Sequence, residues 1–412
     1  MLVKHEQMRS NNALLILDHI RQHGGSTRRN IQKSTQLSWA AVSNISASLV
    51  SKSILYEIPC NEKSMGRLPG YLDFVPMRNL TIGVEITVGG LIIVLMDLRC
   101  NFVDYIVEPL QGIQCQTVLD QIFSGVERMI QRHNLTPDCL LGLGIATQGS
   151  VDRDGTASLY NSFFTDWRDV PLKKMCEERF SIPVRIMHDP VCVALAEQWQ
   201  RRFSDESQFA VLRLSYGIGM SCVVHGLPVR GNDGFSGEVG HMMLDPHGPQ
   251  CSCGNRGCME SYASIRGIFN RVMADYQDEK VLLPSQLQDI RKSSPAFVLA
   301  VVRWCAEQAR AGEERMLQYF SDAGYFLGIG IANIVNLFNP ESVILTGRML
   351  EFSDLFLDRV KETVESHRWK LSRVNLLVSD SDQWQAAIGA GLYFINDAFR
   401  SLQSPLLADS SV

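Results

Sequence analysis

Over the first 76 residues, apolar positions recur first at helical spacing and then in the alternation typical of strands. The asparagines at 11–12 are expected to begin a helix whose apolar positions fall over 14–20, and the glycine pair at 24–25 is expected to end it. A serine or threonine at 26–27 can begin a second, short helix. The start of the chain is therefore predicted to be helical.

A third helix is predicted to follow a tight turn over 35–37, beginning at Ser38 and ending near Lys52. Its apolar positions would face a core; they are Val42, Ile45 and Leu49. Its opposite face carries Trp39, Ala40, Ser43, Asn44 and Ala47. Small and polar side chains on such a face allow a helix to lie close to base edges in a DNA major groove.

Two predicted strands, 54–58 and 71–75, enclose a polar loop. Helix–turn–helix spacing followed by a hairpin with a basic loop is typical of a winged helix, whose loop contacts the DNA backbone or minor groove. The candidate DNA contacts are Arg28 and Arg29 in the second helix, Ser38, Trp39, Ala40, Ser43, Asn44 and Ala47 in the third, and Lys63 and Arg67 in the loop. The alternative is a small three-helix interaction domain, and Trp39 could equally be a core residue.

From residue 80 onward the pattern changes. Apolar runs at 91–95, 141–145, 184–187 and 342–346 alternate with helical stretches, which predicts an α/β body. No internal repeat is evident, and the tail after Ser404 is expected to be disordered.

Composition and charge agree with this division of the chain. Its 412 residues are 45% hydrophobic and 20% charged, which is ordinary for a soluble globular protein of two or three domains. No run of 18 apolar residues and no signal peptide is evident, so no membrane association is expected. Residues 1–76 hold 9 Lys and Arg against 5 Asp and Glu (+4), whereas the remainder holds 30 against 39 (−9). A basic head on an acidic body is typical of a DNA-binding module attached to a soluble sensor.

Three of the eleven cysteines, Cys251, Cys253 and Cys258, lie within eight residues. The others are scattered, as is usual for thiols in a reducing cytoplasm, where we expect the protein to be located. The three thiols can provide three ligands of a tetrahedral Zn²⁺ site, and His241 can provide the fourth. Four protein ligands leave no position for water, so this zinc would be structural. Three free thiols beside an unrelated histidine are the alternative.

The motif Gly-Glu-Val-Gly-His at 237–241, followed by Cys-x-Cys-Gly-x-x-Gly-Cys-x-Glu at 251–260, resembles the signature of the ROK family (repressor, open reading frame, kinase). The resemblance covers nearly the whole chain and implies an actin-like (ribonuclease H-like) two-lobed ATPase fold behind the winged helix-turn-helix. The expected domains are the winged helix at 1–76, a first lobe at 77–190 with about 389–403 packing back on it, and a second lobe at 191–388 with the zinc site and dimerisation helices.

The resemblance also implies that a sugar binds between the lobes. Its hydroxyls would be bound by Asp189, Glu238, His241 and Glu260, since carboxylates accept hydrogen bonds from neighbouring hydroxyls. His241 would bind zinc through one ring nitrogen and present the other to the sugar. The family kinases usually have asparagine where this chain has His188, so His188 is expected to alter which sugar fits or to block the site.

Two loops that bind nucleotide phosphates in the family kinases are altered. In the first, Glu85 replaces an aspartate and Thr87-Val88 replace two glycines, and shifting the alignment by two residues does not restore the site. In the second, Tyr216 and Met220 are bulky where a phosphate should pass. ATP binding is expected to be lost. Asp189, the general base in a kinase, would then only bind sugar, and no residue would be catalytic.

The sequence therefore predicts a non-enzymatic, sugar-responsive transcriptional regulator of carbohydrate uptake or catabolism genes, most simply a repressor. Its partners would be double-stranded operator DNA, a small sugar effector and further copies of the chain in a homodimer or tetramer, because a palindromic operator presents two half-sites. The alternative from another class is a ROK-type kinase for a hexose or N-acetylhexosamine that keeps a DNA-binding head. A third is a regulator controlled by a protein partner, with its sugar pocket unused.

Overall fold

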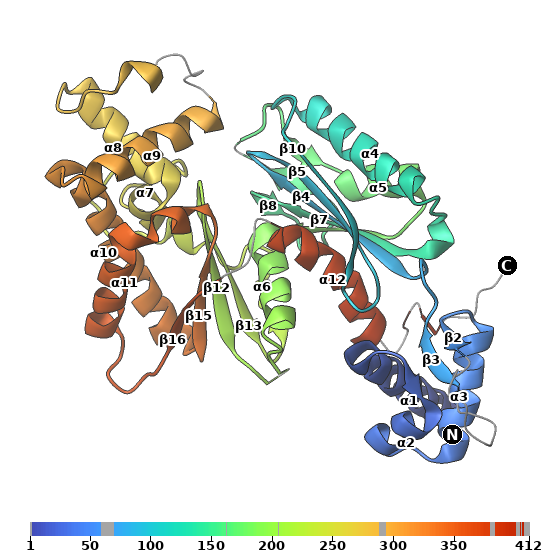
Figure 1. Cartoon of the computed structure of the whole chain (residues 1–412). Helices are drawn as coiled ribbons and strands as arrows, with labels where there is room; N and C mark the ends of the chain where they lie inside the picture. Colours follow the sequence, from blue (N-terminus) through green and yellow to red (C-terminus); the bar gives the residue numbers. More distant parts are fainter. Residues whose placement is uncertain are drawn as a thin grey trace.

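The computed structural model describes residues 2–58, 70–161, 163–204, 206–287, 294–379 and 384–400, together with 404 and 406–407. Two α/β lobes stand next to each other, and a small helical domain built from the first residues packs at one end of the first lobe (Figure 1). The predicted DNA contacts Lys63 and Arg67 lie outside the described residues.

The described part of the N-terminal domain contains three helices and three short strands. They are α1 (Leu2–His23), α2 (Arg28–Thr35) and α3 (Trp39–Ser51), with β1 (Ser26–Thr27), β2 (Leu55–Ile58) and β3 (Tyr71–Phe74) in the sheet order β1-β3-β2. Thr27 and Ser38 cap α2 and α3, because each side chain accepts a hydrogen bond from a backbone N–H of the first turn. Gln36 in the left-handed region ends α2. These boundaries confirm the predicted second and third helices and the turn between them.

The predicted start of the first helix is wrong. Helix α1 begins at Leu2, so the asparagines at 11–12 lie in its interior and cap nothing. No glycine or proline interrupts residues 3–10, and the helix therefore extends through them. The apolar face was placed correctly, since Ile16, Leu17 and Ile20 are all fully buried.

The first lobe is built on a five-stranded sheet in the order β11-β7-β4-β5-β6. Its strands are β4 (Leu80–Thr87), β5 (Gly90–Met96), β6 (Phe102–Glu108), β7 (Leu140–Thr147) and β11 (Val184–His188), and its helices are α4 (Cys115–Arg132) and α5 (Leu172–Phe180). A second, small sheet is formed by β8 (Ser150–Val151), β9 (Ser158–Tyr160) and β10 (Arg168–Val170). The central strands are buried along their length, which explains their continuous apolar runs.

The second lobe repeats this topology, with a sheet in the order β14-β13-β12-β15-β16. Its strands are β12 (Phe209–Leu214), β13 (Ile218–Val224), β14 (Leu227–Pro228), β15 (Ser342–Thr346) and β16 (Asn375–Val378), and its helices are α7 (Met259–Ala263), α8 (Ile265–Gln277), α9 (Pro295–Arg310), α10 (Glu314–Phe338) and α11 (Ser353–His367). In both lobes an antiparallel meander is extended by two parallel strands. The two lobes share a topology although the sequence shows no repeat.

Two helices, α6 (Asp189–Gln200) and α12 (Gln385–Arg400), pack against each other between the lobes (Figure 1). Helix α12 also packs on β4 and β7 of the first lobe. A Cβ atom on Gly83 of β4 would lie 1.9 Å from the carbonyl oxygen of Ala387, and one on Gly144 of β7 would lie 2.0 Å from that of Ala390. Only glycine permits such a close approach of helix to sheet.

The N-terminal domain shares its hydrophobic core with the body. Ile16, Leu17 and Ile20 of α1 belong to one buried cluster with Ala398 of α12 and with Leu406. Lys52 Nζ also donates a hydrogen bond to the carbonyl oxygen of Leu407, the residue that follows Leu406, at 2.7 Å. The disorder expected after Ser404 is therefore wrong at 406–407, because this segment has an apolar site to fill.

We predict that Leu406→Ala loosens the N-terminal domain. Removing a buried leucine side chain from a core typically costs about 2–5 kcal/mol. Native-state hydrogen exchange of the α1 and α3 amides measures the loss as faster exchange in these helices and not in β12. Leu407→Ala is the control, since Leu407 is only half-buried. Equal exchange in Leu406→Ala and the unchanged protein would show that the tail does not support the domain.

Candidate functional site

A polar cavity of about 280 Å³ lies between the lobes, where β11 meets α6. All five predicted sugar-binding residues line it: His188, Asp189, Glu238, His241 and Glu260. His188 ends β11 and Asp189 begins α6, whereas the other three come from the second lobe. The fold therefore brings together residues that are up to 72 positions apart in the chain.

The acidic groups of this cavity differ in their surroundings. Asp189 is 5% exposed, and its Oδ1 lies 3.4 Å from Nε2 of His188. Glu260 is half-buried and accepts a hydrogen bond from the N–H of Ile218 at 2.9 Å, whereas Glu238 is exposed. A small cavity with a few convergent acceptors is a suitable site for a molecule rich in hydroxyl groups.

A residue that the sequence analysis missed, Arg213 of β12, also lines this cavity. Its Nη2 lies 2.5 Å from Oε1 of Glu85 on β4, and its Nε lies 3.2 Å from Oδ2 of Asp189. Burial raises the pKa of Glu85, and the Arg213 guanidinium opposes that rise. Burial alone would lower the pKa of Arg213, but the two carboxylates raise it above its ordinary value.

The sequence did contain a signal for this ion pair. Glu85 and Arg213 are each the single charged residue of a strand that is otherwise mostly apolar, β4 and β12 respectively. A charged side chain in a buried strand requires a partner of opposite charge, so two such residues are candidates to meet.

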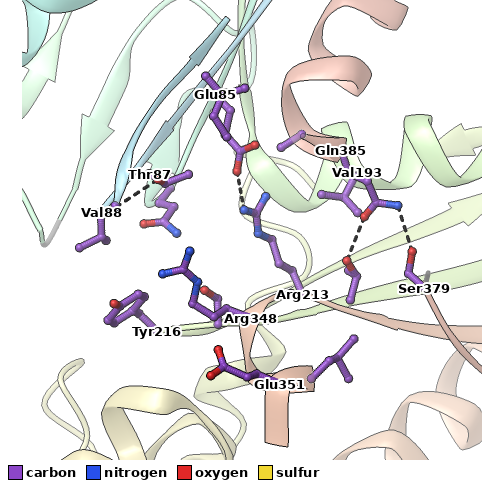
Figure 2. Close-up of a pocket in the computed structure, with 18 of the residues that line it drawn as sticks. Glu85, Thr87, Val88, Val193, Arg213, Tyr216, Arg348, Glu351, Ser379 and Gln385 are labelled. Carbon is purple, nitrogen blue, oxygen red and sulfur yellow. Dashed lines mark hydrogen bonds and ion pairs between the residues drawn. The ribbon is translucent and has the colours of Figure 1, made fainter. Parts of the chain in front are cut away.

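A second cavity of about 360 Å³ lies on the other side of Arg213, and Figure 2 shows the Glu85–Arg213 pair within it. It is lined by Thr87 and Val88 from the first altered loop and by Tyr216 from the second. Arg213 and Tyr216 line both cavities, so they stand where the two spaces meet.

Met220 does not have its expected place. Its side chain is 2% exposed within the core of the second lobe and lines neither of the two cavities as the structure describes them. The reason is its position on β13, where successive side chains point to opposite faces of the sheet. Of the two bulky residues expected in the second loop, Tyr216 alone lines the two cavities as the structure describes them.

Further side chains line the first cavity, among them Gln148, Tyr160, Phe163 and Arg266. The Arg266 guanidinium lies 4.4 Å from the centre of the Phe163 ring. Burial lowers the pKa of Arg266, and Glu260 opposes this effect. The cavity is thus lined by aromatic and cationic side chains as well as acidic ones.

The four predicted metal ligands form a compact cluster beside this cavity. One donor atom from each of His241, Cys251, Cys253 and Cys258 lies within 4.8 Å of the others. His241 Nδ1 is 3.6 Å from Cys251 Sγ, and Cys253 Sγ is 3.7 Å from Cys258 Sγ. These four side chains could hold a metal ion.

Glycine allows the cysteine loop to close. Gly257 has a φ of +61°, and a Cβ atom there would lie 1.5 Å from the carbonyl oxygen of Asp245. The loop therefore folds back against the segment after His241, and Cys258 is placed at the start of α7.

The predicted DNA contacts of α3 lie on one side of the N-terminal domain. Trp39 is 52% exposed, which excludes it from the core; Ala40, Asn44 and Ala47 are exposed and Ser43 is half-buried. Val42, Ile45 and Leu49 are buried on the other side, as predicted. Arg29 is exposed, whereas Arg28 is ion-paired with Glu57 at 2.7 Å. A DNA contact by Arg28 would therefore compete with this pair.

Two lobes of one topology, with a polar cavity between them and a helix–turn–helix domain in front, define a two-lobed, actin-like protein with an N-terminal winged helix. The chain belongs to the ROK family, whose profile matches residues 97–396. Of the helices that the structure describes, none is long and apolar enough to cross a membrane.

Similar proteins include regulators and kinases. The chain is 31% identical to a putative xylose repressor of Caldicellulosiruptor sp., over 87% of this chain and 88% of that protein. It is 28% identical to a glucokinase of Halalkalibacterium halodurans, over 61% of this chain and 74% of that protein. A solved ROK family transcriptional regulator, described as a homologue of the E. coli MLC protein, has the same fold with a TM-score of 0.75, at 22% identity and with 97% and 98% of the two chains covered.

Proposed function

We propose that this protein is a sugar-responsive DNA-binding transcriptional regulator, most simply a repressor of genes for carbohydrate uptake or catabolism. The observation that carries the proposal is the combination, in one chain, of an exposed helix face suited to a major groove and a polar interlobe cavity of about 280 Å³. Repressors are among the relatives that align over most of the chain, with 87% and 92% of its length covered in two of them. A sugar bound between the lobes would change the affinity of the N-terminal domain for an operator.

The sugar would be held by Asp189, Glu238, His241 and Glu260, with His188 restricting which sugar fits. Asp189 and Glu260 supply hydrogen-bond acceptors from opposite lobes, so a sugar that engages both would hold the lobes together. His241, with Nδ1 directed at Cys251, can present its other ring nitrogen to the cavity.

On the DNA side, Ser38, Trp39, Ala40, Ser43, Asn44 and Ala47 would approach base edges, with Arg28, Arg29, Lys63 and Arg67 near phosphates. We propose a homodimer or a pair of dimers, because a palindromic operator requires two copies of α3 at a fixed spacing.

We predict specific binding to DNA from upstream of the protein's own gene, and a change in that affinity with one sugar of a panel. Fluorescence anisotropy at one fixed salt concentration measures both quantities.

Asn44→Ala should weaken specific binding by about 1–3 kcal/mol, since a bidentate contact to a base is worth that much. Gln22→Ala, an exposed change on α1, is the control and should leave binding unchanged. Folded protein without specific DNA binding would contradict the proposal.

The metal cluster is proposed to hold a structural Zn²⁺ ion. Tetrahedral zinc with Zn–S bonds of about 2.3 Å places its sulfur ligands about 3.8 Å apart, close to the 3.7 Å between Cys253 and Cys258. When bound, zinc would fix the loop and the direction of the His241 ring. With four protein ligands, no position is left for a substrate or water.

We predict about one zinc per chain, measured by elemental analysis, and its loss in Cys253→Ser. Cys253 is exposed, so this change removes a ligand without opening a cavity in the core. The thermal midpoint of unfolding should fall with the metal content, because ligand binding to the native state stabilises it. Cys139→Ser, at an isolated half-buried thiol, is the control. Unchanged metal content and stability in Cys253→Ser would refute the zinc site.

A sugar kinase is the second candidate function, since a glucokinase is among the relatives. The Glu85–Arg213 pair argues against this function, because both charged groups lie in the second cavity. Arg213 is also ion-paired with Asp189, the carboxylate that would act as the general base of a kinase. We predict no sugar-dependent ADP release with hexoses, N-acetylhexosamines or xylose in a coupled assay. Turnover with any of them would replace the regulator proposal by a kinase or a bifunctional protein.

A further inference from the structure

Arg213 lines both cavities and pairs with residues across the two lobes. It belongs to β12 of the second lobe, whereas Glu85 lies within β4 of the first-lobe sheet and Asp189 begins α6 directly after β11 of that sheet. We call Glu85, Arg213 and Asp189 the interlobe bridge. Its partners lie 2.5 Å and 3.2 Å from the guanidinium.

Breaking the interlobe bridge would either expose a charged side chain to solvent or leave it buried without its partner. The Glu85 side chain is 1% exposed and the Arg213 side chain 15% exposed. Arg213 is the main group that stabilises the Glu85 charge, and a backbone hydrogen bond from Ala387 of α12 adds a smaller contribution. A buried carboxylate that loses its cationic partner is strongly destabilised. The relative position of the lobes is therefore tied to this ion pair.

We propose that Arg213 is a positioning residue: it orients the Asp189 carboxylate toward the sugar cavity and, through Glu85, transmits sugar binding to the first lobe. The inference rests on the proposed function, and adds the residue through which the sugar acts. A sugar hydroxyl that donates to Asp189 shares this carboxylate with Arg213, so the strength of the Arg213–Glu85 pair changes with occupancy.

Helix α12 provides the path from the bridge to the N-terminal domain. Its first residues, Gln385 and Ala386, line the cavity that contains Glu85. Its first half packs on β4 at Gly83, two residues from Glu85, and its far end places Ala398 in the core of the N-terminal domain. A shift of β4 relative to β12 therefore moves a helix that is built into the DNA-binding part.

Three variants separate the two tasks of Arg213. Arg213→Gln removes the cation, Arg213→Lys keeps the charge but not the forked geometry that reaches two carboxylates, and Glu85→Gln cuts only the link to β4. Arg303→Gln is the matched control: Arg303 lines the same cavity and pairs with Glu351 at 2.6 Å, but both residues belong to the second lobe.

The first readout is hydrogen exchange of the β4 and β12 amides in the sugar-free protein. Arg213→Gln and Glu85→Gln should both exchange faster in these strands, and Arg303→Gln should match the unchanged protein. Equal exchange in these three variants and the wild-type protein would refute the role of the interlobe bridge. This comparison needs neither sugar nor DNA, so it decides the inference even if the proposed function fails.

The second readout is calorimetric titration with D-xylose, D-glucose and N-acetyl-D-glucosamine, paired with operator anisotropy. For a sugar that binds, Arg213→Gln should lose about tenfold or more in affinity, and Arg213→Lys should recover only part of it. Glu85→Gln should lose less sugar affinity than Arg213→Gln, yet lose the response of operator binding to sugar. If operator binding by Glu85→Gln still responds fully to sugar, the transmission step is wrong. If the wild-type protein binds no operator, the proposed function is refuted instead.

Discussion

The close contact between α12 and the first-lobe sheet is the constraint on which the rest of the structure depends. Gly83 and Gly144 permit backbone to lie against backbone, and Gly389 does the same against α6, where a Cβ atom would be 1.7 Å from the carbonyl oxygen of Cys192. Contacts of this kind leave little freedom to slide, because no side chain can adjust between them. Helix α12 therefore moves with β4, and the N-terminal domain, which shares its core with the end of α12, moves with both.

This arrangement gives a physical meaning to the altered phosphate loops. In a kinase, the space between the lobes must admit a nucleotide and leave a base free beside the sugar. Here a guanidinium and a carboxylate occupy that space, and the same guanidinium holds Asp189. The ion pair replaces a ligand-dependent contact between the lobes by a permanent one, whose strength the neighbouring sugar cavity can change. In the proposed regulator, this fold would couple the lobes without phosphoryl transfer.

The sequence predicted what is encoded locally. The caps at Thr27 and Ser38, the apolar face of α3 and the cysteine cluster each depend on residues within a few turns or one short loop. The start of α1 and the ordered Leu406 were missed, because a distant core overrides weak local preferences. The Arg213–Glu85 pair joins residues 128 positions apart, and only the folded topology sets them at hydrogen-bond distance. The five candidate sugar residues could be collected beforehand only because family motifs mark them, since they come from both lobes.

The central claim is that the sugar cavity and the DNA-binding domain are thermodynamically coupled through the body of the protein. Coupling is reciprocal: if sugar changes operator affinity by some factor, operator must change sugar affinity by the same factor. The most direct test is to titrate the effector sugar into the free protein and into the operator-saturated protein at the same salt concentration. The account predicts two different dissociation constants whose ratio equals the sugar-induced change in operator affinity. Identical dissociation constants would contradict it.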